Sequence, residues 1–598
     1  MPVSAPAAFG TSDWIVVFGV LAATTVLGLF LGKGATIREF FLGGRRLPWW
    51  SVSASIVATE ISAVTLVSVP FLVFKPGGNF AYLQLILIGS VLARLAIAWW
   101  LVPVYFEREI YSPYDFIGAR LGRRAKDLAT ALFAVGGVLG QASRVYLTAL
   151  VLEIVLAGPL ATLSAATHVP TLALSIALLT LFAVLWTWIG GMAAVIWTDF
   201  VLFFVFTASA IALLFVVAGK LDLGFERIWR VGIDAHKFDL LDFDTSPARA
   251  FTFWTATIAA SWGGIASYGI DQLMAQRIFC CRSVADARKA VVWSSVGVIV
   301  PVLVAVVGVG LFAYYERNPM SESALALYAK KGENLLLIFT TDVVPSGWKG
   351  LVVAGIFAAA ISSLDGILTA LSQVTLSSVF APLRRRSIER MAPSARPSAA
   401  VEERRAVRIA RLLVIVFGLV LGVLAFAMDE LSRHFGSILE LALTMATFTQ
   451  GALLAGFALA LLAPRIGGSG FMWSAPYSSA FVFALAWHGE TARTLIVAAA
   501  ITFFCTWFFM RTVPDLKSGE PVKRVALQFA ILVLALLVLV WIQRHGLVVV
   551  EKDAHTDSEW LSLPVAFPWY VPIASTLAFV LGLVWARDEG PTSLEFAG

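Results

Sequence analysis

The sequence predicts an all-α polytopic membrane protein, and three features lead to this fold class. Of the 598 residues, 59% are hydrophobic and only 14% are charged, and the mean hydropathy is +0.86; a soluble domain is about one quarter charged. The apolar runs are about 20 residues long or longer, which suits membrane-spanning helices and exceeds the length of a transmembrane β-strand. Two runs carry polar and glycine residues at their centres in a way that indicates an inverted repeat. This composition excludes a soluble enzyme, a disordered chain and a disulfide scaffold.

We expect fifteen membrane helices, because fifteen apolar runs alternate with polar breaks. The first seven lie near residues 13–31, 49–73, 80–104, 127–157, 171–190, 193–219 and 251–272. The other eight lie near residues 290–315, 349–380, 410–428, 435–463, 471–488, 493–511, 525–543 and 567–587.

Basic residues gather in alternate loops, which predicts the orientation of the chain in the membrane. These loops lie at 33–46, 108–126, 277–289, 384–408 and 511–524. We expect them in the cytoplasm, with the N-terminus outside and the C-terminus inside, in a protein of the cytoplasmic (inner) membrane. No basic segment precedes the first apolar run, so we expect no cleavable signal peptide.

Three longer polar segments interrupt the pattern. Segments 220–250 and 316–348 fall on the external side and carry mixed charge, which predicts short amphipathic caps. Segment 383–408 falls on the cytoplasmic side and is rich in Arg, Ser, Pro and Ala. We interpret it as a flexible connector and expect no nucleic-acid partner, since it holds no aromatic residue to stack on a base.

Two predicted helices are interrupted at mid-membrane, where freed backbone groups need protein or a water-filled cavity around them. The second helix contains ATEISA at 58–63, and the seventh contains SWGG at 261–264. Five helices separate their starts, and since five is odd the two units enter the membrane in opposite orientations. Discontinuous helices at matching places in inverted halves indicate the midplane binding site of a secondary transporter. The alternative is that the small residues only allow close helix packing.

Five ordered motifs resemble the sodium:solute symporter family, which includes sodium/glucose, sodium/proline and sodium/vitamin carriers. They are FLGGRRLPWW at 41–50, YSPYDF at 111–116 with RLG at 120–122, GGMAAVIWTD at 190–199, DQ at 271–272 with QR at 276–277, and AAISSLD at 359–365. The resemblance covers about residues 40–465. It implies sodium-driven solute uptake by alternating access, with Na⁺ as the coupling ion, in a monomeric functional unit.

The family's fold is the leucine-transporter type, with five plus five helices in two inverted halves. Here one extra helix precedes this core and about four follow it. The resemblance divides the chain into an N-terminal helix and loop (1–48), a first repeat (49–219), an external loop (220–250), a second repeat (251–465) and C-terminal extra helices (466–598).

By resemblance, sodium binds to neutral oxygens of the second and ninth helices. The ligands implied are the backbone carbonyls of Ala58, Ile61 and Ala359 and the hydroxyls of Ser362 and Ser363. Unwound backbone suits this role, because only freed carbonyls can turn toward an ion. The alternative for the two serines is a small packing face.

Asp199 is a further candidate, since an intramembrane carboxylate is usually functional. In some relatives the matching aspartate serves a second sodium ion or an exit path. The family's usual glutamine is Leu202 here, and its usual hydroxyl after the serine pair is Gly366. The alternative is an interfacial aspartate paired with a cytoplasmic arginine.

The solute site has three charged candidates at similar membrane depth, Glu60, Arg94 and Arg144. Each unpaired charge there costs at least ~2.5 to 3.5 kcal/mol, so we expect either a buried Glu60–Arg144 ion pair or a contact between an arginine and the solute. The formal sum of +1 favours an organic anion slightly; a sugar or polyol is the alternative. The other cavity candidates on the broken helices are Thr65, Trp262, Gly264, Ser267 and Tyr268.

Other function classes receive less support. A membrane enzyme would need a nucleophile with a base, or metal ligands such as HExxH, at one depth, and we identify none in the sequence. The six histidines share no metal spacing, and the three cysteines are interpreted as packing residues. A channel, or a sensor with the transporter fold, is left as an alternative.

Overall fold

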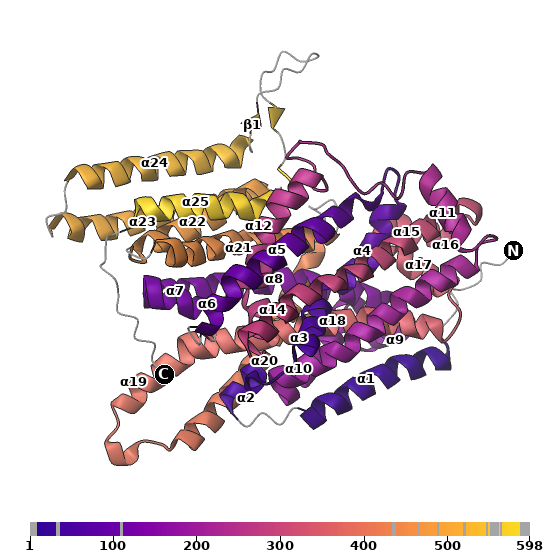
Figure 1. Cartoon of the computed structure of the whole chain (residues 1–598), viewed down its shortest axis with the longest axis horizontal. Helices are drawn as coiled ribbons and strands as arrows, with labels where there is room; N and C mark the ends of the chain where they lie inside the picture. Colours follow the sequence, from indigo (N-terminus) through magenta and orange to yellow (C-terminus); the bar gives the residue numbers. More distant parts are fainter. Residues whose placement is uncertain are drawn as a thin grey trace.

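The computed structural model is a bundle of helices, most of which run in roughly the same direction across the molecule (Figure 1). It describes residues 9–31, 36–107, 110, 112–432, 438–463, 466–486, 490–517, 522–545, 548–549, 561–562 and 565–586. In this part of the chain the only strands are β1 (Val548–Val549) and β2 (Leu561–Ser562), which pair antiparallel. The predicted all-α class is confirmed.

The helices up to residue 234 are α1 (Thr11–Leu31), α2 (Ile37–Leu42), α3 (Trp49–Glu60), α4 (Ala63–Phe74), α5 (Val91–Ala96), α6 (Val102–Glu107), α7 (Pro113–Leu121), α8 (Arg123–Val155), α9 (Ala157–Thr167), α10 (Thr171–Gly219) and α11 (Phe225–Asp234). The later helices are α12 (Ser261–Gly264), α13 (Gln272–Phe279), α14 (Val284–Trp293), α15 (Ile299–Arg317), α16 (Glu322–Lys330), α17 (Leu335–Asp342), α18 (Trp348–Thr375), α19 (Ala381–Glu389), α20 (Ala399–Ser432), α21 (Ile438–Leu462), α22 (Ser469–Ala486), α23 (Glu490–Lys517), α24 (Val522–His545) and α25 (Tyr570–Val584). Tighter or wider helical turns join several of these into longer rods, which are Phe80–Glu107, Val284–Arg317 and Trp348–Glu389.

Among the described residues, twelve helices are long and apolar enough to cross a membrane, and the bent pair α3 and α4 makes thirteen. The sequence predicts fifteen. The remaining two predicted segments are also helical, but each is a weaker span. Segment 251–272 is divided by π-helical turns and its helix ends at Ile270. Helix α22 has 18 residues and contains Pro476 and several serines.

The predicted break in the second helix is confirmed. Helices α3 and α4 meet at an angle of 58°, and Ile61 and Ser62 between them have extended backbone. A helix end leaves its last carbonyls without helical partners. The break therefore presents carbonyl oxygens in the middle of the protein.

The predicted break at Ser261–Gly264 is wrong, because these four residues form α12 inside a continuous helix. The chain leaves the helix later, at Asp271, whose ψ is 127°. A Cβ on Gly264 would lie 2.6 Å from the Ala93 Cβ. Close packing against the rod 80–107 therefore explains this glycine.

Helix α10 confirms two predicted spans, 171–190 and 193–219, which meet at a kink. Gly191 has φ of +60°, and a Cβ there would lie 2.8 Å from the Phe40 carbonyl oxygen. Glycine is required at this position by both conformation and space.

The segment 383–408 differs from the flexible connector predicted. Helix α19 covers residues up to Glu389, and α20 begins at Ala399, so most of the segment is helical. Arg384 donates two hydrogen bonds to Glu402, at 3.0 and 2.7 Å, which join the two helices. Together they project from the lower left of the bundle in Figure 1.

Of the predicted caps, segment 220–250 holds the strongly amphipathic helix α11 and, after it, Lys237, which anchors the loop to the end of α4. Its side chain is buried, and its Nζ donates to the carbonyl oxygens of Val73, Phe74 and Lys75 at 2.8, 3.3 and 3.0 Å. A cation at a helix C-terminus stabilises the helix, although burial lowers the pKa of Lys237. This lysine holds the outer part of the broken helix in place.

We expect Lys237→Met to destabilise the protein by about 1–3 kcal/mol, because one buried and two partly buried carbonyls lose their donor. Thermal unfolding in detergent measures this effect as a lower midpoint. The control is Lys289→Met at an exposed lysine. Equal midpoints for the two variants would show that the carbonyls do not depend on Lys237.

Candidate functional site

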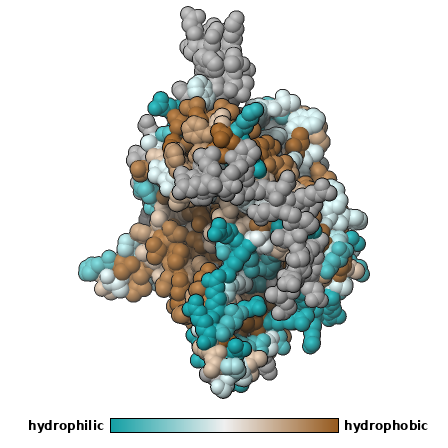
Figure 2. Space-filling view, turned by 90° about the vertical axis from the view of Figure 1, so that its left-hand side faces the viewer, coloured by the Kyte–Doolittle hydropathy of each residue, from teal (hydrophilic) through white to brown (hydrophobic). Residues whose placement is uncertain are grey.

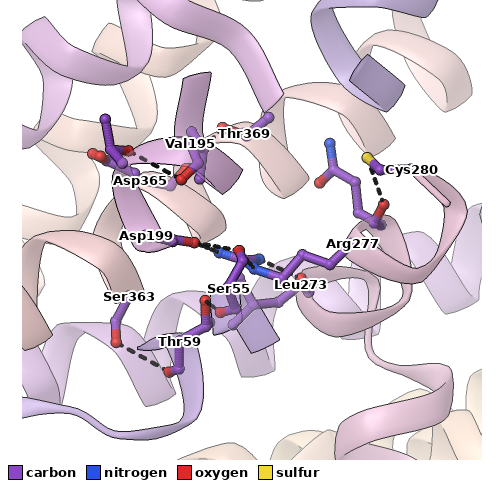
Figure 3. Close-up of polar contacts among 12 residues, drawn as sticks. Ser55, Thr59, Val195, Asp199, Leu273, Arg277, Cys280, Ser363, Asp365 and Thr369 are labelled. Carbon is purple, nitrogen blue, oxygen red and sulfur yellow. Dashed lines mark hydrogen bonds and ion pairs between the residues drawn. The ribbon is translucent and has the colours of Figure 1, made fainter. Parts of the chain in front are cut away.

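The carboxyl end of α3 packs against α18, the central and most buried long helix. The Ser363 Oγ donates to the carbonyl oxygens of Thr59 and Ala359, both at 3.2 Å (Figure 3). Ala58 and Ala359 are fully buried, and Ile61 is the first extended residue of the break. This contact brings together Ser363 Oγ and Ala359 O, two of the predicted sodium ligands, with the carbonyl oxygen of Thr59.

Ser362 lies on the other side of this group, next to the Asp199 carboxylate. It is fully buried, and its hydroxyl makes no hydrogen bond of ordinary length within the described residues. A buried hydroxyl without such a bond is costly. Its role as a sodium ligand stays a prediction.

Asp199 forms an ion pair with an arginine, Arg277, which was the alternative to a sodium site for this residue. Arg277 Nη2 lies 3.1 Å from Asp199 Oδ2, and both side chains are fully buried. Ser55 Oγ donates to the same carboxylate at 2.5 Å and accepts from Arg277 Nε at 3.0 Å. Figure 3 shows these three side chains converging. Thr187 donates separately to nearby Asp365 at 3.0 Å.

The predicted Glu60–Arg144 ion pair is wrong. Glu60 pairs with Arg94, and its second oxygen accepts from the Tyr268 hydroxyl at 2.6 Å. Arg94 also donates to the hydroxyls of Ser90 and Ser294, at 2.6 and 2.9 Å, and its guanidinium lies 4.5 Å from the centre of the Tyr268 ring. The charges of Glu60 and Arg94 therefore satisfy each other beside the break.

A cavity of about 270 Å³ opens beside this ion pair, and Arg144 lies in its wall. Within the described residues, its guanidinium donates a 3.5 Å hydrogen bond from Nη1 to the Thr59 carbonyl oxygen. Thr59 O accepts from Ser363 as well. The Thr59 carbonyl of the broken helix thus accepts hydrogen bonds both from Ser363, a predicted sodium ligand, and from Arg144 in the cavity wall.

Most of the predicted solute candidates line this cavity. Thr65, Gly264, Ser267 and Tyr268 belong to its wall, together with Glu60 and Arg144. Arg94 lies behind the wall, where it is buried in its ion pair. Trp262 points elsewhere, since its Nε1 donates to Ser575 of α25 at 3.0 Å and its side chain is half exposed.

Asp271 and Gln141 also line the cavity and were missed by the sequence analysis. Adding Asp271 to Glu60, Arg94 and Arg144 changes the formal sum of these charges from +1 to zero, so the charge argument based on an excess of +1 is wrong. Its Oδ1 accepts from the Leu273 amide at 2.9 Å, at the N-terminus of α13. Gln141 lies one turn before Arg144 on the same face of α8, and its Oε1 makes no hydrogen bond in the described part of the chain. The DQ motif could have signalled Asp271; nothing in the sequence singled out Gln141.

The model of the sodium:solute symporter family matches residues 40–476. The chain belongs to the sodium:solute symporter family. It is 28% identical over 425 residues to the sodium/sialic acid symporter SiaT of Proteus mirabilis, and the match covers 69% of this chain and 77% of SiaT. It is 26% identical over 471 residues to sodium-coupled monocarboxylate transporter 2 of Mus musculus, and the match covers 77% of this chain and 70% of that protein.

A solved structure of a Na⁺-coupled sialic acid symporter, in a substrate-bound outward-open state, shares the fold. The TM-score is 0.68 at 21% identity, and the match covers 97% of this chain and 100% of that one. The leucine-transporter-type fold is therefore confirmed. As a member of the sodium:solute symporter family, this integral membrane protein couples solute transport to Na⁺.

Proposed function

We propose that this sodium:solute symporter carries a small organic anion, whose carboxylate binds Arg144. The observation that carries the proposal is the difference between the two arginines. Arg94 is saturated by Glu60 and two serines, whereas Arg144 faces the cavity with one long hydrogen bond. An arginine fork matches a carboxylate in two parallel hydrogen bonds.

The other charges near the cavity support this assignment. Asp271 is stabilised by the amide at the start of α13, where a negative charge is favoured. Of the two arginines near the cavity, Arg94 already pairs with Glu60, so Arg144 is the one that can bind an anionic solute. The names of two relatives, a sialic acid symporter and a monocarboxylate transporter, also denote organic acids.

For coupling, we propose that sodium binds Ala58, Ile61, Ala359, Ser362 and Ser363. The support is the oxygen-rich contact between the broken helix and α18. Thr59 O accepts hydrogen bonds from both Ser363 and Arg144. Sodium that fixes the backbone between α3 and α4 therefore also fixes the Arg144 side chain in position to bind the solute. We assign Asp199 to its ion pair with Arg277 instead of a second sodium site.

We further propose that the two repeats span 49–219 and 251–465, flanked by segments 1–48, 220–250 and 466–598. The basic loops then face the cytoplasm, the N-terminus lies outside and the C-terminus inside, in the cytoplasmic membrane. The functional unit is one chain. Transport is its activity, without a separate enzymatic one.

Arg144→Gln should abolish most anion uptake while the protein still folds. A charge-assisted hydrogen bond contributes about 1.5–3 kcal/mol, which corresponds to a roughly 10- to 100-fold loss of uptake at limiting solute. Sodium-driven uptake of labelled carboxylates into proteoliposomes measures the effect, with sialic acid and short monocarboxylates in the panel.

The matched control is Arg123→Gln, at an exposed arginine of the same helix. It should transport like the parent protein. If Arg144→Gln also transported normally, the carboxylate would bind elsewhere. If only neutral sugars or polyols were transported, the anion assignment would be wrong although sodium coupling would stand.

A further inference from the structure

The arm formed by residues 381–408, which comprises α19 and the start of α20, concentrates the charge of the protein. Its 28 residues hold eight arginines and three glutamates, which gives 8 − 3 = +5 of the chain's net +6. Figure 2 faces the end of the molecule from which the arm projects, and hydrophilic side chains extend over its lower part. The remaining 570 residues together contribute only +1.

Ion pairs within the arm involve Arg384 and Arg385. Arg384 binds Glu402 in the bidentate contact between the helices, and Arg385 lies 3.1 Å from Glu389 within α19. The Arg385 side chain is nevertheless 71% exposed. Other exposed arginines follow on the two helices and on the segment between them, namely Arg386, Arg390, Arg396, Arg404, Arg405 and Arg408.

Apolar side chains are exposed directly beside this charge. Val379, Phe380 and Leu383 are 46%, 39% and 56% exposed, at the point where the rod Trp348–Glu389 passes into the arm. Apolar residues followed by arginines along one helix match the passage from hydrocarbon to headgroups in a bilayer. The segment 381–408 has no aromatic residue, which disfavours stacking on nucleic-acid bases.

We propose that the arm binds the headgroups of anionic phospholipids at the membrane surface. Arginine clusters next to a membrane helix attract acidic lipids, and the guanidinium fork fits a phosphate. The arm continues directly from α18, so bound lipid would fix one end of the helix with Ser362 and Ser363. Only this last consequence rests on the proposed sodium ligands.

The test measures lipid retention and requires no transport. The full chain is purified in detergent with equal amounts of phosphatidylglycerol and phosphatidylcholine, and the lipids that remain bound after gel filtration are quantified. The variant Arg385→Gln/Arg386→Gln/Arg390→Gln should retain at least about five-fold less phosphatidylglycerol, since one basic residue near a membrane surface contributes about that factor. Retention of phosphatidylcholine should not change.

Two further variants make the result specific. Arg230→Gln/Arg249→Gln/Arg317→Gln removes the same charge from exposed side chains elsewhere and should retain lipid normally. Replacing the three arm arginines with lysine keeps the charge and should restore most of the retention. Equal phosphatidylglycerol retention in the arm variant and the remote variant would overturn the proposal. So would release of the lipid by millimolar inorganic phosphate, which would indicate a site for free anions.

Discussion

Sodium-dependent uptake should be lost when Ser362 and Ser363 are both replaced with alanine, and the protein should still fold. The change removes two neutral hydroxyls and strands no charge. Ser363 loses hydrogen bonds to Thr59 O and Ala359 O, at a cost of about 1 kcal/mol. Uptake of labelled solute with and without a sodium gradient measures the loss, which we expect to reach the background of empty liposomes.

The matched control replaces two other serines of the same rod, Ser372 and Ser377. Ser372 is also buried and donates to Ala410 O at 2.8 Å, so its removal has a similar cost for folding. This control should keep its sodium stimulation. Normal sodium stimulation in the Ser362/Ser363 variant would place the ion elsewhere.

The second large effect concerns the ion pair beside the break. Glu60→Gln leaves the Arg94 guanidinium, whose side chain is 2% exposed, without its counter-charge. Stranding a buried charge costs about 3 to 5 kcal/mol, so this variant should express poorly and unfold at a much lower temperature. Arg94→Gln should be milder, because Glu60 is 21% exposed at the cavity and retains the Tyr268 hydroxyl.

The double variant Glu60→Gln/Arg94→Gln should recover most of the stability, since two neutral amides leave no stranded charge. A double-mutant cycle on the thermal midpoints measures this coupling. Additive losses would mean that the pair does not form in the membrane. Arg144→Gln should not couple to Glu60→Gln, in contrast to the pairing expected from the sequence.

The broken second helix could be predicted from the sequence because ATEISA places a charge and a serine where a span needs apolar residues. The SWGG segment also predicted a break, but it is helical, and Gly264 serves close packing against a neighbouring helix. Glycine permits both a break and a close contact, and only the position of Ala93 decides between them. Composition within one helix holds no information about that neighbour.

The partner of Glu60 was mispredicted for a related reason. Apolar runs place Glu60, Arg94 and Arg144 at similar depths, but they do not give the direction of each side chain around its helix axis. In the fold, Arg94 points at Glu60 and Arg144 points into the cavity. Likewise, the contact of Arg384 with Glu402 joins residues 18 apart and turns an expected flexible connector into two packed helices.

Accumulation of a labelled carboxylate against its gradient tests the central claim most directly. Proteoliposomes with the parent protein are given an inward sodium gradient, and the internal solute concentration is followed with and without a sodium ionophore. We predict that at least one carboxylate of the panel accumulates above its external concentration, that the ionophore abolishes this accumulation, and that Arg144→Gln prevents it. Accumulation that persisted without a sodium gradient, or that occurred only for neutral sugars, would contradict sodium-coupled transport of an organic anion.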